Sequence, residues 1–237
     1  TPVILADYCI EYWDKDRRVD FINAPDREPG WRSPVKAWNA GFRKATWDIL
    51  YCFSSETVQR EGNLARAKEM IRGVKVTGGP PMGSGTSENY PMPLVLHGSV
   101  SCSCGPTGTE VNWNGQAPGN LFGDAAHPRP LGFIWAAPRK TVLSMGGYDE
   151  AFDEGFWFDD DDFWFRMWKA GLDLVFDDSI SGLHLHHERP ALATSEGQKG
   201  ILMNQAYMLY KHHSLRPMAT VLVKEERTPG RTIWRHA

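Results

Sequence analysis

Short apolar runs and helical repeats alternate along the first part of this chain. A short apolar run bounded by polar or turn-forming residues predicts a buried strand, and apolar residues three and four apart predict a helix. The predicted strands are Val3–Ala6, Val19–Ile22 and Ile49–Phe53, and the predicted helices are Ser33–Ala45 and Asn63–Ile71. Ser33 followed by Pro34 is a favourable helix start with the serine as N-cap. This alternation predicts an α/β sandwich with a mostly parallel central sheet.

The second half of the chain resumes this pattern after a long stretch of different composition. From Thr77 to Pro130, glycine, proline, serine and asparagine dominate, which is typical of binding loops or disorder. Beyond it, the predicted strands are Leu131–Ala136, Leu172–Phe176 and Gly182–His187, and the predicted helices are Arg139–Met145, Phe158–Ala170 and Gly200–Lys211. Gly171 is expected to end the helix before it. The tail from Thr228 is predicted to be loosely attached.

Length and charge narrow the class of protein. The 237 residues, 41% of them hydrophobic, can bury a real core, and we expect a single domain over 1–237. Its parts are an N-terminal half, 1–76, an irregular loop region, 77–130, and a C-terminal half, 131–237. The net charge of −3, without any concentrated run of Lys and Arg, argues against nucleic acid as the main partner.

Signals for membranes and secretion are weak in this sequence. No apolar run approaches the roughly 18–20 residues that cross a bilayer, so we expect no transmembrane segment. The first residues lack the basic-then-apolar pattern of a signal peptide. Four cysteines are too few for a disulfide scaffold of this size and indicate ordinary thiols in a reducing compartment. The expected location is therefore cytoplasmic.

The strongest candidate chemistry is a run of four acids, Asp159–Asp162, at the start of the helix Phe158–Ala170. Acids in a first helical turn can simply favour the positive end of the helix dipole. Four in a row repel one another, however, and aromatic residues on both sides should desolvate them. Like charge and desolvation both raise carboxylate pKa values, which favours a catalytic role for this run.

The residues around this run resemble the acceptor-side signature of family 2 glycosyltransferases. In that family a GGxDE loop precedes an acidic helix of the form (E/D)D-x-D followed by an arginine and then a glycine. The matching residues are Gly146–Phe152, Phe158–Phe163, Arg166 and Gly171. The tryptophan Trp157 before the acidic run is also similar to the acidic motif of the β-1,4-galactosyltransferases. The resemblance implies a GT-A fold, which is Rossmann-like, although no counterpart of the usual first strand precedes Thr1.

The resemblance also implies a donor site in the N-terminal half. In this family a strand ends in D-x-D, whose carboxylates hold Mn²⁺ or Mg²⁺ on the donor diphosphate. The matching strand is followed by Ser54, Ser55 and Glu56, so only the second carboxylate is kept. Asn39 lies in the segment that resembles the family's sugar-nucleotide helix, and Asp7 resembles the acid that contacts the base.

Further roles follow from the same resemblance. Asp160 falls on the family's second acid and is the expected general base, with Asp162 as the nearest rival and Asp159 beside them. A base opposite the leaving group implies inversion at the anomeric carbon. For the metal, the expected ligands are Glu56, His184 and then His187, from the late histidine element.

The acceptor side has its own candidates. Asp149 and Glu150 in the Gly-Gly loop are expected to bind acceptor hydroxyls or to satisfy backbone groups. Trp135 and Trp157 are expected either to stack on sugar rings or to fill the core.

The expected function is therefore transfer of a sugar from a nucleotide-sugar donor, by default a UDP-sugar, to a carbohydrate or glycoconjugate acceptor. Because Ser is a poor metal ligand beside a carboxylate, Ser54 weakens the metal prediction. Two alternatives stay open: a transferase fold that only binds a carbohydrate or nucleotide, and a metal-dependent hydrolase.

Overall fold

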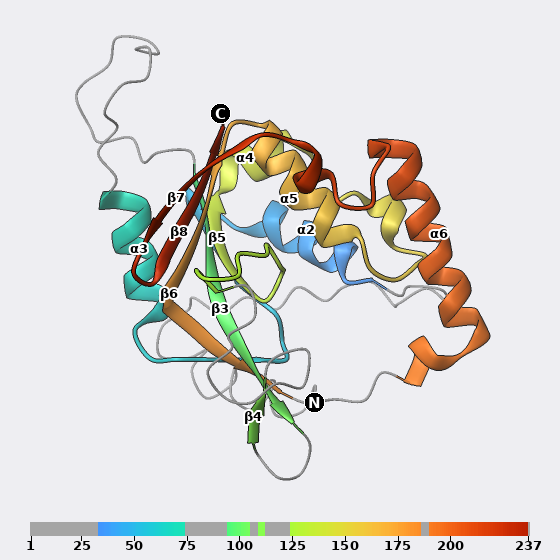
Figure 1. The fold of residues 1–237 in the computed structure, drawn as a ribbon, viewed down its shortest axis with the longest axis horizontal. Coiled ribbons are helices and arrows are strands. Elements are labelled where there is room, and N and C mark those ends of the chain that lie inside the picture. Colours follow the sequence, from blue (N-terminus) through green and yellow to red (C-terminus); the bar gives the residue numbers. More distant parts are fainter. Residues whose placement is uncertain (1–32, 74–93, 105–108, 112–123, 186–189, 237) are drawn as a thin grey trace. The chain divides into compact units, whose positions relative to one another are not determined.

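The computed structural model describes residues 33–73, 94–104, 109–111, 124–185 and 190–236, and element labels follow Figure 1. All of these residues belong to the unit Trp31–Ala237. The predicted strands Val3–Ala6 and Val19–Ile22, together with Asp7, lie outside the described residues, as does His187.

Eight strands of the described chain form one sheet, in the order β1-β5-β3-β6-β8-β7, with β2 paired to β6 and β4 paired to β3. The strands are β1 (Ile49–Phe53), β2 (Thr57–Gln59), β3 (Leu94–Cys104), β4 (Thr109–Val111), β5 (Ile134–Pro138), β6 (Asp173–His184), β7 (Val223–Thr228) and β8 (Arg231–His236). The two long central strands, β3 and β6, run parallel from Leu94↔Asp173 to Cys102↔His184, with a register shift at Gly98/Ser99.

The expectation of a mostly parallel sheet is wrong for these strands. Apart from β3 with β6, the pairings in the described residues are antiparallel. Both β5 and β6 flank β3, but β5 runs against it, so the helical connection from β5 to β6 joins strands of opposite direction. Alternation of strands and helices thus predicted the α/β class, while the strand directions depended on sheet neighbours that are distant in sequence.

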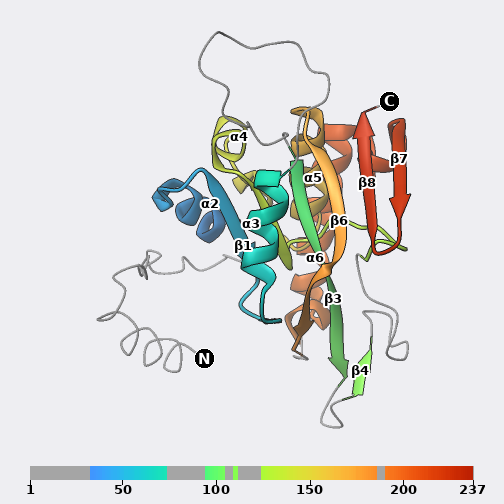
Figure 2. The ribbon, with the colours of Figure 1, turned by 90° about the vertical axis from the view of Figure 1, so that its left-hand side faces the viewer.

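Helices cover both faces of the sheet. They are α2 (Val35–Lys44), α3 (Asn63–Gly73), α4 (Arg139–Ser144), α5 (Asp159–Lys169) and α6 (Ser195–His212), with short 3-10 turns η2 (Glu150–Phe152), η3 (Pro190–Ala193) and η4 (Pro217–Thr220). Figures 1 and 2 show α3 on one face, and α2, α4 and α5 on the other, with α6 beyond α5.

The alternation of side chains along β3 explains this layering. Val95 joins the core cluster that contains Phe42 of α2 and Phe163 of α5, whereas Leu94 and Leu96 join the cluster that contains Ile71 of α3. Successive residues of a strand point to opposite faces, so one apolar strand buries side chains under both helical layers. This all-apolar β3 segment lies within 77–130, which had been expected to be irregular.

Several local predictions are confirmed, and others need correction. The strand Ile49–Phe53 has the predicted bounds, and Gly171, at φ +90°, follows the end of α5 as expected. The segments predicted as separate strands at 172–176 and 182–187 instead belong largely to one long strand, β6. Ser33 does not cap α2; its hydroxyl donates to Asp159, 126 residues away.

The C-terminal tail is a structural part of the sheet, which corrects the prediction of loose attachment. β8 pairs with β6 from Leu174↔Trp234 to Asp177↔Arg231, and β7 pairs with β8. The imidazole of His236 stacks on Trp168 of α5 at 4.0 Å. Within the described residues, no helix combines the length and apolar character that crossing a membrane requires.

Candidate functional site

The four aspartates at the start of α5 lie in four different surroundings. The turn before the helix places two successive residues, Trp157 and Phe158, at φ +67°. Non-glycine residues with such φ values are strained and are frequent at functional sites. This strained turn aims the first residues of α5 at the segment before β5.

Asp160 is held by two donors, one on each carboxylate oxygen. The backbone N–H of Gly132 donates to Oδ2 and the hydroxyl of Tyr148 donates to Oδ1, both at 3.0 Å. Desolvation by burial, and then the neighbouring charge of Asp159, raise the pKa of Asp160 to about 7, although both hydrogen bonds act to lower it. A carboxylate with a pKa near neutral pH is suited to accept a proton as a general base.

The aspartates beside it are placed less favourably for that role. The hydroxyl of Ser33 donates to Asp159 at 2.9 Å, and burial raises the pKa of Asp159. Burial also raises the pKa of Asp161, opposed mainly by the positive charges of Arg129 and Arg216.

Asp162, the predicted rival base, is fully buried and is contacted by three basic side chains. Its carboxylate receives Arg166 Nε at 2.8 Å, Lys211 Nζ at 2.7 Å and His212 Nε2 at 2.7 Å. Its side chain is 0% exposed. These contacts fasten α5 to the end of α6 and leave this carboxylate enclosed by protein, which favours a structural role.

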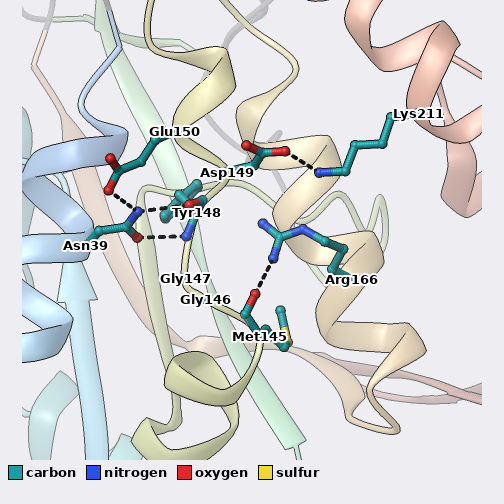
Figure 3. A pocket seen from close by; sticks show the side chains of 9 residues that line it. All are labelled: Asn39, Met145, Gly146, Gly147, Tyr148, Asp149, Glu150, Arg166 and Lys211. Carbon is teal, nitrogen blue, oxygen red and sulfur yellow. Dashed lines mark hydrogen bonds and ion pairs between the residues drawn. The ribbon is translucent and has the colours of Figure 1, made fainter.

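The Gly-Gly loop forms a pocket of about 330 Å³ beside this network (Figure 3). It is lined by Asn39, Met145, Gly146, Gly147, Tyr148, Asp149, Glu150, Arg166 and Lys211. Asp149 accepts from Lys211 at 2.5 Å and Tyr207 at 2.9 Å. Burial acts to raise its pKa, but these donors outweigh it, so the pKa of Asp149 is lowered.

Other residues on this side have structural partners. The side-chain amide of Asn39, which was predicted to bind the donor, is buried. It accepts from the N–H of Tyr148, donates to the carbonyl of Tyr148 and donates to the carboxylate of Glu150. Trp135, predicted as a possible stacking surface, is only 1% exposed and packs against Phe42 and Trp164, which corrects that interpretation in favour of core.

Trp157 remains accessible, unlike Trp135. Its side chain is 52% exposed on the strained turn before α5. The buried amide of Asn204 on α6 donates to the carbonyl oxygens of Phe152 and Trp157, both at 3.0 Å. The indole is thus presented on a fixed backbone next to the acidic run.

The predicted donor side brings Glu56 and His184 together. Glu56 Oε2 lies 3.2 Å from His184 Nε2, although 128 residues separate them in sequence. The antiparallel pairing of β2 with β6 causes this meeting, because Thr57 is opposite His184 and the N–H of Leu185 donates to the Glu56 carbonyl at 2.7 Å. Ser54, two residues before Glu56, shares a hydrogen bond of 2.7 Å with the Thr57 hydroxyl.

This pair suits some metals in part. Carboxylate oxygen and imidazole nitrogen are both acceptable to Mn²⁺, whereas Mg²⁺ strongly prefers oxygen. No group of three or more His, Cys, Asp and Glu side chains able to hold a metal ion occurs in the described part of the chain. Glu56 and His184 therefore supply two candidate ligands, and a bound diphosphate would have to contribute others.

One dipeptide links the two halves of the site. Gly132 donates its N–H to Asp160, and the next residue, Phe133, packs its ring against His184 at 4.9 Å between centroids. The Phe133 carbonyl also accepts the N–H of Ser54 at 2.9 Å. The base candidate and the Glu56–His184 pair therefore contact two successive residues, whose Cα atoms are about 3.8 Å apart.

Neither a protein-family model, nor a curated protein, nor a solved structure matches this chain. The geometry of the site and the spacing of the motif are therefore the features that indicate a function.

Sequence reasoning did not identify the partners that distinguish the aspartates. Tyr148 was part of the recognised loop, but only the fold shows that its hydroxyl reaches Asp160. Gly132 carried no signal of its own; in the structure, a Cβ there would lie 2.9 Å from the Asp160 carboxylate. Lys211 and His212 are basic residues in the last turn of α6, where such residues are common because they interact favourably with the negative end of the helix dipole. Nothing in this pattern indicated a contact with Asp162.

Proposed function

We propose that this protein is an inverting glycosyltransferase that moves a sugar from a nucleotide-sugar, by default a UDP-sugar, to a hydroxyl of a carbohydrate or glycoconjugate. The observation that carries the proposal is the Gly132–Phe133 segment, in which Gly132 contacts Asp160 and Phe133 contacts His184, the partner of Glu56. The spacing of the family 2 motif supports the same assignment.

The donor end is assigned to Glu56 and His184. When the glycosidic bond to the diphosphate breaks, negative charge grows on the phosphate oxygens. A divalent cation such as Mn²⁺, bound there with the donor, would supply charge stabilisation for the departing diphosphate. Glu56 and His184 would hold that ion, and Phe133 packs against the imidazole and fixes its orientation.

The acceptor end is assigned to Asp160. Its carboxylate accepts the proton of the attacking hydroxyl as that oxygen bonds to the anomeric carbon, on the face opposite the leaving diphosphate. Positioned general bases typically contribute about 10²–10⁴-fold to the rate. Trp157 offers an exposed ring surface next to this position, on which an acceptor sugar can stack.

We also propose that the fold is a GT-A variant. The layers of helices on both faces of the sheet, and the order of the motifs along the chain, support that assignment.

Release of nucleoside diphosphate tests the function. The protein is incubated with a panel of nucleotide sugars and simple sugar acceptors, with Mn²⁺ or with EDTA. We expect acceptor-dependent release of the diphosphate that falls at least tenfold with EDTA and in Glu56→Gln. Glu61→Gln, the same change at an exposed carboxyl five residues along, is the matched control and should keep wild-type release.

The other outcomes separate the alternatives. Nucleotide binding without any turnover would favour a binding protein, which the Ser54 substitution makes the natural second candidate. Cleavage of phosphoesters in the absence of a sugar donor would favour a hydrolase. Either result would overturn the transferase proposal.

A further inference from the structure

Tyr148 is fixed in place on every side. Its side chain is 2% exposed, and its ring stacks on Phe163 of α5 at 4.0 Å with an angle of 14° between the planes. The side-chain amide of Asn39 accepts from the Tyr148 N–H and donates to the Tyr148 carbonyl, both at 2.8 Å. A phenol held by ring and backbone alike has little freedom to move its hydroxyl.

That hydroxyl contacts the base candidate. It donates to Asp160 Oδ1 at 3.0 Å, while Gly132 donates to the other oxygen, Oδ2. Burial, followed by the charges of Asp160 and Asp159, raises the pKa of Tyr148 well above its ordinary value of 10.0. The phenol therefore stays protonated over the working pH range and acts toward Asp160 as a donor.

We propose that Tyr148 is a positioning residue for Asp160: its hydroxyl fixes the rotation of the carboxylate and stabilises the ionised form that takes the acceptor proton. This inference rests on the proposed function, since it assigns a role within the same site. Neither the acidic run nor the motif resemblance assigns any role to this hydroxyl.

The two hydrogen bonds counteract the effects that raise the pKa of this half-buried carboxylate. Burial and the neighbouring charges of Asp159 and Asp161 raise the pKa of Asp160. The hydrogen bonds from Tyr148 and Gly132 lower it. The positive charges nearby, Arg129 and Arg216, act on Asp161. Each donor uses one lone pair of its oxygen, so lone pairs remain on the carboxylate to accept a proton from substrate.

The substitution Tyr148→Phe isolates the hydroxyl, because the phenyl ring retains the stacking on Phe163. We expect the pKa of Asp160 to rise by about one unit, since one hydrogen bond to a charged group is lost. The acid limb of the kcat profile should move up in pH by the same amount, and kcat at pH 7 should fall about fivefold, because the ionised fraction of a base whose pKa is about 7 falls by that factor. KM for the donor should change less than twofold.

The measurements are the pH profile of diphosphate release and an NMR titration of ¹³C-carboxyl-labelled aspartates, with the Asp160 signal assigned from its loss in Asp160→Asn. Tyr51→Phe is the matched control. It also removes a phenol hydrogen bond, to Gln59 at 2.5 Å, but one made elsewhere. It should leave both the acid limb and the Asp160 titration at their wild-type positions.

The two proposals fail separately. If wild-type protein releases no diphosphate from any donor, the proposed function fails, and the titration alone decides the role of Tyr148. An unchanged Asp160 titration in Tyr148→Phe overturns the positioning role whatever the activity. Should that variant not fold, 3,5-difluorotyrosine at position 148 keeps the hydroxyl and makes it a stronger donor. The pKa of Asp160 must then fall, and no change would again overturn the inference.

Discussion

At the scale of single residues, adjacent aspartates of identical chemistry differ because the fold gives each a different partner. Asp160 faces a phenol and a backbone N–H, whereas Asp162 faces Arg166, Lys211 and His212. Burial raises the pKa of Asp160 to about 7, so a base at this position should become active as the pH rises through 7.

Asp160→Asn tests this assignment through both activity and stability. We expect kcat to fall by about 10²–10⁴-fold, with nucleotide binding retained. Because folding raises this pKa from its ordinary 3.8, the protonated acid favours the folded state, and that stability is lost as pH rises from about 4 through 7. The melting temperature of the variant, relative to wild type, should therefore increase between pH 5 and pH 8.

Asp161→Asn, one residue along the same helix turn, is the control for this prediction. It should lower kcat by much less than Asp160→Asn, since Asp161 makes no contact with Gly132 or Tyr148 among the interactions seen at the site. Equal losses in the two variants would contradict the assignment of the base.

The sequence alone could locate the acids but could not rank them. Four adjacent carboxylates next to aromatic residues predicted perturbed pKa values, and the family spacing favoured Asp160. The meeting of Glu56 with His184 was also expected, and their contact at 3.2 Å is consistent with it. Tyr148, Ser33 and Lys211 act through contacts across 12 to 126 residues, which no local pattern records.

At the scale of elements, α5 depends on α6 for its position. Asp162 receives Lys211 and His212 from α6, and Asn204 of α6 holds the carbonyl of Trp157 before α5. The apolar pattern of the α6 segment predicted a helix, and the structure extends that helix to 18 residues. The pattern did not indicate that polar side chains of α6 contact the first turn of α5 and Trp157 before it.

Asp162→Ala should therefore destabilise the fold. The substitution removes the buried carboxylate that Arg166 and His212 contact and one of the two carboxylates that Lys211 contacts. Breaking a buried ion pair typically costs about 3–5 kcal/mol of unfolding free energy. Denaturant unfolding measures this change. Glu196→Ala on helix α6 removes a carboxylate whose pair with Lys199, at 3.6 Å, is exposed, and it should cost no more than about 1 kcal/mol. A loss of that small size in Asp162→Ala would contradict the structural role.

Element boundaries and sheet pairing differ in how far the sequence reveals them. Apolar periodicity and glycine signals placed Ile49–Phe53 and the end of α5 well. Strand direction was not predictable in the same way, because β6 lies beside β3, β8 and β2, which come from three distant parts of the chain. The long strand β3 was missed because only Leu94–Leu96 form an apolar run in it, and glycine- and proline-rich sequence surrounds them.

At the scale of the whole described molecule, the central parallel pair β3 and β6 organises the site. β6 carries His184 at its end, and β5, on the other side of β3, is preceded by Gly132 and Phe133. Helix α5 packs on one face of this sheet and brings Asp160 to the same segment. In the proposed function, Asp160 would serve the acceptor and the Glu56–His184 pair the diphosphate of the donor.

The anomeric configuration of the first product tests this account most directly. With an α-linked UDP-sugar as donor, ¹H NMR at early times reports the coupling constant of the newly formed glycosidic bond. We expect a β-linked product, because in the proposed function Asp160 activates the acceptor on the face opposite the leaving diphosphate. An α-linked product, or the absence of transfer from every donor tested, would contradict it.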